Sequence, residues 1–162
     1  MMQWLGIVLA LVPIQAKALS CVPWGVTDAY LQADAAPASY IVVFGDLTFN
    51  PALLPQVDPE RQGETPPLTQ IPASFAGQAV VARGADVSFS ANITLEVQCF
   101  GPWCAQPVPG KVLAFVRQDG DGYVVQDNPC GGHLFMDPRR DQIRQVRQCM
   151  RGQACLPLGT RP

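Results

Sequence analysis

Residues 86–99 have the sequence Asp-Val-Ser-Phe-Ser-Ala-Asn-Ile-Thr-Leu-Glu-Val-Gln-Cys. From Val87 to Cys99, apolar side chains alternate with polar ones over thirteen residues. Successive side chains of a β-strand point to opposite faces of a sheet, so this period of two predicts a long strand with one buried and one solvated face. The same pattern places Cys99 on the buried face.

Other strands are predicted where β-branched and aromatic residues concentrate. These segments are residues 40–49, 75–81, 111–117, 123–126 and 132–136. Residues 119–122, Asp-Gly-Asp-Gly, predict a hairpin turn between two of them, because Asp-Gly pairs readily adopt positive φ. Gly77 is expected to mark a β-bulge, since glycine inside a strand often does so.

Helices are predicted near both ends of the chain. Apolar residues with helical spacing predict a short helix over residues 26–36, with Thr27 as its N-cap. A second helix is predicted over residues 138–151, with Asp137 as its cap and Gly152 just beyond its end. Five or six antiparallel strands with a helix at each end are typical of a small closed barrel, so we expect a mainly β fold.

Residues 51–72 include six prolines and predict a long loop between strands, because proline fixes φ and removes a hydrogen-bond donor. Loops of this length are often functional. If the protein is a binding module, we expect a partner to meet this loop, with Leu53 and Leu54, and the rim around Trp24 and Trp103.

The chain begins with a candidate export signal. Residues 4–14 form an apolar run that is too short to span a bilayer, and Gln-Ala-Lys-Ala follows it. We expect a signal peptide over residues 1–18, with cleavage after Ala18 or Ser20, and a secreted or periplasmic protein. The remaining residues, 19–162, have the size of a single domain.

Lipid attachment is the alternative at this position. Residues 18–21, Ala-Leu-Ser-Cys, also resemble a bacterial lipobox, which would place a lipid on Cys21 and anchor the protein at the envelope. Only in that case do we expect the protein to meet a membrane.

Six cysteines follow the leader, and an even number behind an export signal predicts three disulfides in an oxidising compartment. They are Cys21, Cys99, Cys104, Cys130, Cys149 and Cys155. Six cysteines allow 15 pairings, and spacing alone does not choose among them. The chain has no Cys-x-x-Cys pair, the spacing that redox oxidoreductases use to activate a thiolate, so structural disulfides are expected.

No set of residues predicts catalysis, a metal site or a cofactor. His133 is the only histidine, whereas nucleophilic triads and zinc sites need several cooperating groups. A small hydrolase or redox enzyme remains the weaker alternative, and a carboxylate pair such as Asp119 and Asp121 would then be recruited. Nothing in their spacing positions an acid against a base.

The net charge is −2, which excludes the strong basic excess typical of nucleic-acid binders. The charge is uneven, because residues 139–162 contain six arginines and one aspartate. Four of these arginines form one face of the second predicted helix and either solvate it or steer an acidic partner toward it. They are Arg139, Arg140, Arg144 and Arg147.

The order of elements resembles the netrin-like domain of the tissue inhibitors of metalloproteinases. Residues 21–23, Cys-Val-Pro, with the early helix and the strand that begins Tyr-Ile-Val-Val, resemble the start of that domain. Residues 130–138, Cys-Gly-Gly-His-Leu-Phe-Met-Asp-Pro, and the helix that ends near Cys149 resemble its closing segment. The resemblance implies an OB-type five-stranded barrel with flanking helices.

This resemblance also implies how the cysteines pair. It joins Cys21 to Cys130, and the remaining four would then close locally as Cys99/Cys104 and Cys149/Cys155. The family's leading free cysteine, whose amino group and carbonyl chelate the zinc of a target protease, is replaced here by Leu19. The cysteine of the family's first helix is also absent. We therefore expect an exported, non-catalytic binding module whose partner is an unknown protein.

Overall fold

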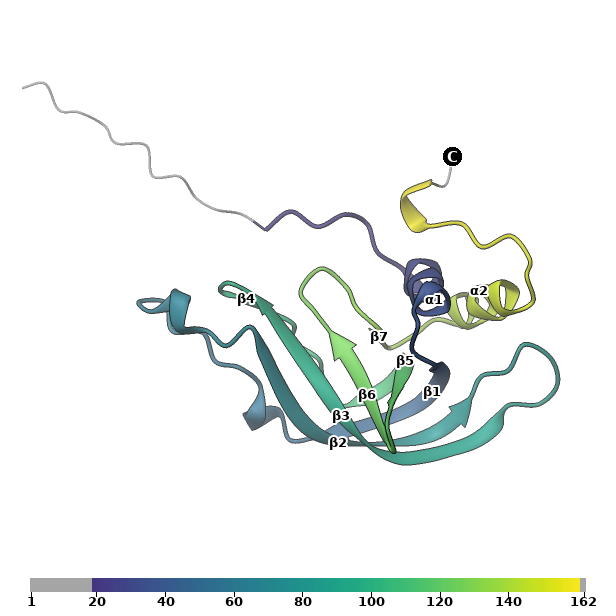
Figure 1. The fold of residues 1–162 in the computed structure, drawn as a ribbon, viewed down its shortest axis with the longest axis horizontal. Helices are drawn as coiled ribbons and strands as arrows, with labels where there is room; N and C mark the ends of the chain where they lie inside the picture. Colours follow the sequence, from purple (N-terminus) through teal and green to yellow (C-terminus); the bar gives the residue numbers. More distant parts are fainter. Residues whose placement is uncertain (1–18, 161–162) are drawn as a thin grey trace, which may run out of the picture.

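The computed structural model describes residues 19–160, in which a seven-stranded mixed sheet carries two α-helices (Figure 1). The strands are β1 (Tyr40–Phe49), β2 (Leu68–Ala79), β3 (Val87–Phe100), β4 (Trp103–Cys104), β5 (Gly110–Asp119), β6 (Gly122–Asp127) and β7 (Leu134–Met136). The helices are α1 (Val26–Ala35) and α2 (Arg140–Met150), with 3-10 turns η1 (Pro51–Leu53), η2 (Gln62–Glu64) and η3 (Leu158–Thr160). The expected signal peptide, residues 1–18, lies outside the described residues.

Five strands pair in a ring. Antiparallel pairs join β1 to β2, β2 to β3, β6 to β5 and β5 back to β1, whereas β3 and β6 are parallel. The expectation of a wholly antiparallel sheet is therefore wrong, and the reason is numerical. A ring with an odd number of strands cannot alternate direction throughout, so at least one pair must be parallel.

The main core lies on the inward faces of these strands. The inward residues Ile93, Leu95, Val97 and Cys99 of β3 are buried, as the alternation predicts. At the other end of the strand the pattern fails, because Val87 stays exposed beside the β2–β3 hairpin. The second half of β3 is therefore more deeply buried in the core than the first half.

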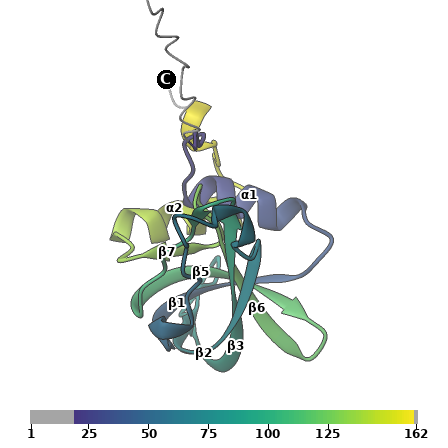
Figure 2. The same cartoon turned by 90° about the vertical axis from the view of Figure 1, so that its left-hand side faces the viewer.

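Both helices lie on the same side of the sheet (Figures 1 and 2). Their apolar residues pack on the outward side chains of β1 and β5 and form a second buried cluster. Its buried members are Val26, Ala29, Ala33, Val42, Val80, Leu113, Phe115 and Val146. Strands β1 and β5 are thus covered on both faces, by the main core on the inside and by the helices on the outside.

The helix starts differ from the predicted caps. Gly25, not Thr27, is the N-cap of α1, and the Asp28 carboxylate accepts a hydrogen bond from the Gly25 N–H at 3.0 Å. Arg139, not Asp137, is the N-cap of α2. The N–H of Asp137 donates to the Lys111 carbonyl at 2.9 Å, and this bond to β5 holds Asp137 outside the helix.

The predicted end of α2 is confirmed. Gly152 follows the helix with φ 70°, a conformation that glycine adopts without strain. Its N–H donates to the Cys149 carbonyl at 2.9 Å, and the Gln153 N–H donates to the Gln148 carbonyl at 3.0 Å. These two bonds form a Schellman motif, which satisfies the last carbonyls of the helix.

The proline-rich loop is shorter than predicted, because β2 begins at Leu68 and includes Pro72. The pairing of β1 with β2 stops at Ala73, so Pro72 lies where β2 has no β1 neighbour. Gly77 does not form the expected bulge. It keeps regular register with Gly45, and a Cβ built on Gly45 would lie 2.6 Å from the Gly77 Cα. The paired glycines therefore permit a close approach of two strands.

All three implied disulfides are present, and none of the described cysteines is free. Cys21–Cys130 joins the N-terminal segment to the loop after β6. Cys99–Cys104 joins β3 to β4, and Cys149–Cys155 joins the end of α2 to the C-terminal tail.

The glycine pair predicts a stability test. Gly45→Ala should lower the free energy of unfolding by about 1 to 3 kcal/mol, because the added methyl group forces two strands apart. Gly63→Ala is the control, since nothing lies within 4 Å of a Cβ built there. Urea unfolding measures both variants, and equal losses would contradict the close-approach explanation.

The disulfides predict unequal losses of stability. Cys21 and Cys130 are 109 residues apart, whereas Cys149 and Cys155 are 6 apart. In the chain-entropy model, removing the long cross-link with a double alanine variant costs about 4 to 5 kcal/mol, and removing the short one costs about 2 kcal/mol. Urea unfolding of the two double variants compares them, and a larger loss for Cys149/Cys155 would contradict the model.

Candidate functional site

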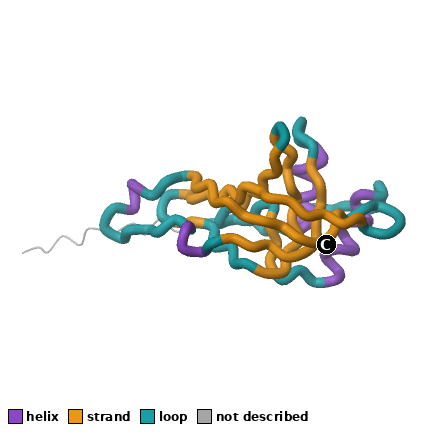
Figure 3. The backbone as a smooth tube through the Cα atoms, turned by 90° about the horizontal axis from the view of Figure 1, so that it is seen from below, coloured by secondary structure: helices purple, strands orange, loops and turns teal. Residues whose placement is uncertain are grey.

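Four connecting segments meet at one end of the sheet. Strands β1, β3 and β6 end there, and β2 and β5 begin there, as the pairs Phe49–Ala73, Leu47–Gly110 and Val97–Asp127 indicate. We call this region the loop end; it consists of residues 50–67, 100–109 and 128–133 and the attached segment 19–25. In Figures 1 and 3 the loop after β1 lies at the left and the α-helices lie toward the right.

Two disulfides and one tryptophan brace the loop end. Cys99–Cys104 closes the β3–β4 hairpin, and Cys21–Cys130 attaches the N-terminal segment. The Trp24 indole N–H donates to the Gly132 carbonyl at 2.9 Å. Gly131, at φ 105°, lies against the indole ring, where a Cβ would come within 2.6 Å of the ring Cγ. Trp24 therefore anchors the segment, whatever part it takes in binding.

The loop of residues 128–132 is held by its own hydrogen bonds. The Asn128 side-chain oxygen accepts from the Cys130 N–H at 2.9 Å, and the Asn128 carbonyl accepts from the Gly131 N–H at 3.1 Å. An asparagine side chain that bonds two residues ahead mimics a backbone turn. The segment that carries Cys130 is therefore preorganised.

The β1–β2 loop is ordered by short-range contacts. Asn50 caps η1 by accepting from the Ala52 N–H at 3.1 Å. Arg61 lies between Asp58 and Glu64, at 2.9 Å and 3.2 Å. The two leucines that the sequence singles out differ, because Leu54 packs against the core and Leu53 remains exposed. Leu53 is thus the one available to a partner.

Exposed apolar side chains gather at the loop end. Nine large apolar residues of the described chain are exposed, and six of them lie in or beside this region, with exposed fractions from 40% to 75%. The six are Val22, Leu53, Leu68, Phe100, Val108 and Met136. Trp103, half-buried, pairs with Phe100 across the β3–β4 hairpin. Apolar surface gathered in one region is typical of an interaction site.

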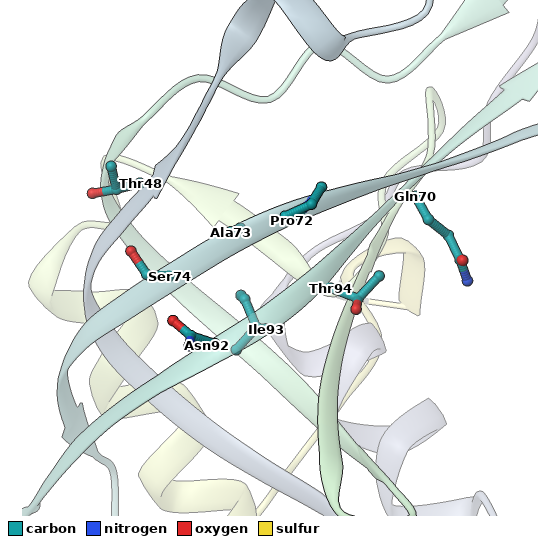
Figure 4. Close-up of a pocket in the computed structure, with 8 residues that line it drawn as sticks. All are labelled: Thr48, Gln70, Pro72, Ala73, Ser74, Asn92, Ile93 and Thr94. Carbon is teal, nitrogen blue, oxygen red and sulfur yellow. The ribbon is translucent and has the colours of Figure 1, made fainter.

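An uncharged groove of about 710 Å³ continues from the loop end along the outer faces of β1, β2 and β3 (Figure 4). Thr48 pairs with Ser74, which pairs with Asn92, so three polar side chains form a row across the strands. Thr94 and Gln70 extend the polar lining. No side-chain hydrogen bond within the described residues engages Thr48, Ser74, Asn92 or Thr94, so their hydroxyl and amide groups are available to a ligand.

The four arginines singled out by the sequence do not belong to the loop end, since one is the N-cap of α2 and three lie within the helix. Arg139 pairs with Asp141 at 3.1 Å, and Arg147 pairs with Asp86 in the β2–β3 hairpin. Arg144 lies close enough to Asp141 to contribute to the lowering of that carboxylate's pKa, for which Arg139 is the main cause. Arg140 has no ion-pair or hydrogen-bond partner among the described residues. The steering surface predicted from sequence is therefore reduced mainly to Arg140 and Arg144.

The candidate hydrolase carboxylates lie at the opposite end of the sheet. Asp119 ends β5 and lies 3.5 Å from the Arg117 guanidinium, and Asp121 is in the exposed turn that follows. Arg117 also approaches the buried Glu96 at 3.8 Å, and Glu96 accepts a hydrogen bond from Gln70 at 3.2 Å. The arrangement links three strands and contains no acid placed against a base.

His133 is buried, but it lies outside the observed strand β7, although the sequence predicts a strand over residues 132–136. It directly precedes β7. Its N–H donates to the Gln126 carbonyl at 2.9 Å, and its carbonyl accepts from the Phe115 N–H at 2.8 Å. Its ring packs between Tyr40 and Phe115, and its Nε2 has no hydrogen-bond partner. Burial, with a smaller contribution from Arg117, lowers the pKa of His133 to about 4.

Asp127 is a buried carboxylate that the sequence analysis missed. It follows Tyr123 and Val125 in the inward phase of β6, so alternation alone could have placed it inside. Burial raises its pKa to about 7, and the hydrogen bond from the Asn128 N–H opposes this rise. Asp127 lies directly before the braced loop 128–132.

In the described part of the chain no group of three or more His, Cys, Asp or Glu residues is arranged to hold a metal ion. None of its helices is long and apolar enough to cross a membrane. Comparisons with protein-family models, with curated proteins and with solved structures find no match.

The two buried groups predict opposite pH dependences. An unfolded histidine binds a proton below its ordinary pKa of 6.5, whereas folded His133 does so only near pH 4, so its contribution to the free energy of unfolding falls as pH decreases from 6.5 to 4. Folded Asp127 keeps its proton up to about pH 7, against 3.8 for the ordinary group, so its contribution falls as pH rises between these values. Between pH 4 and 6.5 the opposite effects of the two groups on the free energy of unfolding therefore nearly cancel in the wild-type protein.

Single substitutions separate them. Relative to wild type, Asp127→Asn should become more stable with rising pH by up to about 1.4 kcal/mol per pH unit, and His133→Gln should show the reverse slope. Urea unfolding between pH 4 and 7 measures both, with Asp121→Asn in the exposed turn as control. Parallel profiles for all four proteins would rule out the two perturbed groups.

Proposed function

We propose that this chain is an exported, non-catalytic binding module that recognises a partner protein through its loop end. The observation that carries the proposal is the gathering of six exposed apolar side chains in this one region. Proteins seldom expose clustered apolar groups unless another surface covers them. The adjoining uncharged groove supplies hydrogen-bonding groups beside the apolar ones, a combination typical of protein interfaces.

We further propose that the ring of five strands is an OB-type barrel of the netrin-like kind. The ring of pairings, the single parallel pair and the two covering helices support it. In OB-type barrels the loop between the first two strands and the face of the second and third strands carry recognition. The loop of residues 50–67 and the groove on β1–β3 occupy the corresponding places.

The mode of binding proposed here differs from that of the metalloproteinase inhibitors. The resemblance implies that the amino group and carbonyl of a leading cysteine chelate the zinc of a target protease, but Leu19 stands at that position here. Recognition through Leu53, Leu68 and Phe100 needs no metal ion. A metalloproteinase is therefore only one class of partner to test.

The pairing of all six cysteines in disulfides supports the proposal that the protein is exported. Disulfides persist in oxidising compartments, which agrees with a secreted or periplasmic protein. A lipid on the Cys21 sulfur and the Cys21–Cys130 bond exclude each other, because one sulfur cannot form both. The intact mass of the mature N-terminus distinguishes a free chain from an acylated one.

Substitution of the exposed apolar residues tests the proposed binding surface. The triple variant Leu53→Ser/Leu68→Ser/Phe100→Ser should lose at least about tenfold in partner affinity, because central apolar contacts dominate interface energies. The control Val87→Ser/Leu156→Ser removes exposed apolar groups elsewhere and should bind as wild type does. Quantitative capture from the exported fraction, followed by binding measurements with each recovered partner, provides the comparison.

Two outcomes would contradict these proposals. If the triple variant retains its disulfides and melting temperature and still captures every partner that wild type captures, the loop end is not the binding surface. If wild type captures no partner and a metalloproteinase panel is not inhibited, the binding-module proposal itself fails.

A further inference from the structure

A second hollow, of about 510 Å³, lies between the start of α2 and the outer faces of β1 and β5. Its volume falls within the range of small-molecule sites. The residues that line it are Phe44, Lys111, Asp137, Pro138, Arg140 and Ile143. None of them belongs to the loop end or to the groove of Figure 4, so this hollow is a separate feature.

The hollow has an apolar floor. Phe44 of β1 and Ile143 of α2 pack against the buried cluster beneath the helices. Pro138, which precedes the helix, completes the apolar part of the lining. The floor is continuous with a packed core, and such a floor suits an apolar group of modest size.

One unpaired charge of each sign lines the hollow. The carboxylate of Asp137 and the guanidinium of Arg140 have no ion-pair or hydrogen-bond partner among the described residues. Lys111 is already engaged, since its Nζ lies 2.8 Å from the Asp46 carboxylate. The free charges are therefore one carboxylate and one guanidinium.

Both unpaired side chains are exposed to solvent at the rim of the hollow, and each has a local cost. Arg140 is the first residue of α2, where the partial positive charge of the helix N-terminus disfavours a cation. The neighbouring Arg139 is neutralised by Asp141, whereas Arg140 is not. Asp137 has φ 45°, and a non-glycine residue in this region carries backbone strain. A bound anion near Arg140 would relieve the first of these costs.

We propose that this hollow binds an apolar α-amino acid as its zwitterion. The ligand carboxylate faces Arg140 and the helix N-terminus, the ammonium group faces Asp137, and the side chain lies on the floor of Phe44 and Ile143. A simple fatty or keto acid would bring its carboxylate beside Asp137 without compensation. A ligand with both charges matches both unpaired groups.

NMR titration of the disulfide-bonded mature protein tests the ligand class. Leucine should produce saturable shifts of the amide signals at residues 137–143. Isocaproate lacks the ammonium group, leucinamide lacks the carboxylate and glycine lacks the apolar side chain, so each should bind at least about tenfold more weakly. Absence of saturable shifts with leucine, or equal binding of isocaproate, would overturn the proposal.

Substitutions test the two charged groups with matched controls. Arg140→Gln should weaken leucine binding by about tenfold or more, whereas Arg144→Gln, one turn further along the helix, should leave it unchanged. Asp137→Asn preserves the shape of the residue and tolerates positive φ, and it should abolish the preference for leucine over isocaproate. Equal effects of Arg140→Gln and Arg144→Gln would show that the pocket does not select the ligand. These readouts do not depend on the loop end or its partner.

Discussion

The ring of five strand pairs is the constraint on which the rest of the structure depends. An odd ring must contain a parallel pair, and here it joins β3 to β6. Because the two strands run in the same direction, the loops that follow them emerge at the same end as the end of β1. The candidate binding surface therefore follows from the direction of the strands, and residues far apart in sequence meet there because of this pairing.

Local patterns in the sequence predict most elements, because the spacing of apolar and polar residues in a segment does not depend on distant parts of the chain. Residues 40–49 match β1, the Asp-Gly hairpin joins β5 to β6, and Gly152 ends α2 as expected. The errors arise where a distant partner decides the conformation. Asp137 is held by the carbonyl of Lys111, so a residue with good capping chemistry remains outside the helix. No local pattern indicates such a bond.

The candidate sites are less predictable than the fold because they depend on register. The row formed by Thr48, Ser74 and Asn92 exists only when three strands are aligned, and each residue alone is an ordinary surface position. The arginines of α2 illustrate the same limit. Helical spacing groups them on one element, but Arg147 finds Asp86 in a hairpin sixty-one residues away. Exposed Leu53, by contrast, is suggested by its proline-rich surroundings.

The long cross-link between Cys21 and Cys130 can form only if Cys21 has not already paired with a cysteine that lies between them. A chain made from its N-terminus presents Cys21 well before Cys130, and Cys99 and Cys104 both appear in the interval. Either of them could capture the waiting thiol. The hairpin between β3 and β4 holds these two competitors opposite each other, and their short loop favours rapid closure. Closure of this hairpin before Cys130 is available would remove both competing thiols and leave Cys21 to pair with Cys130.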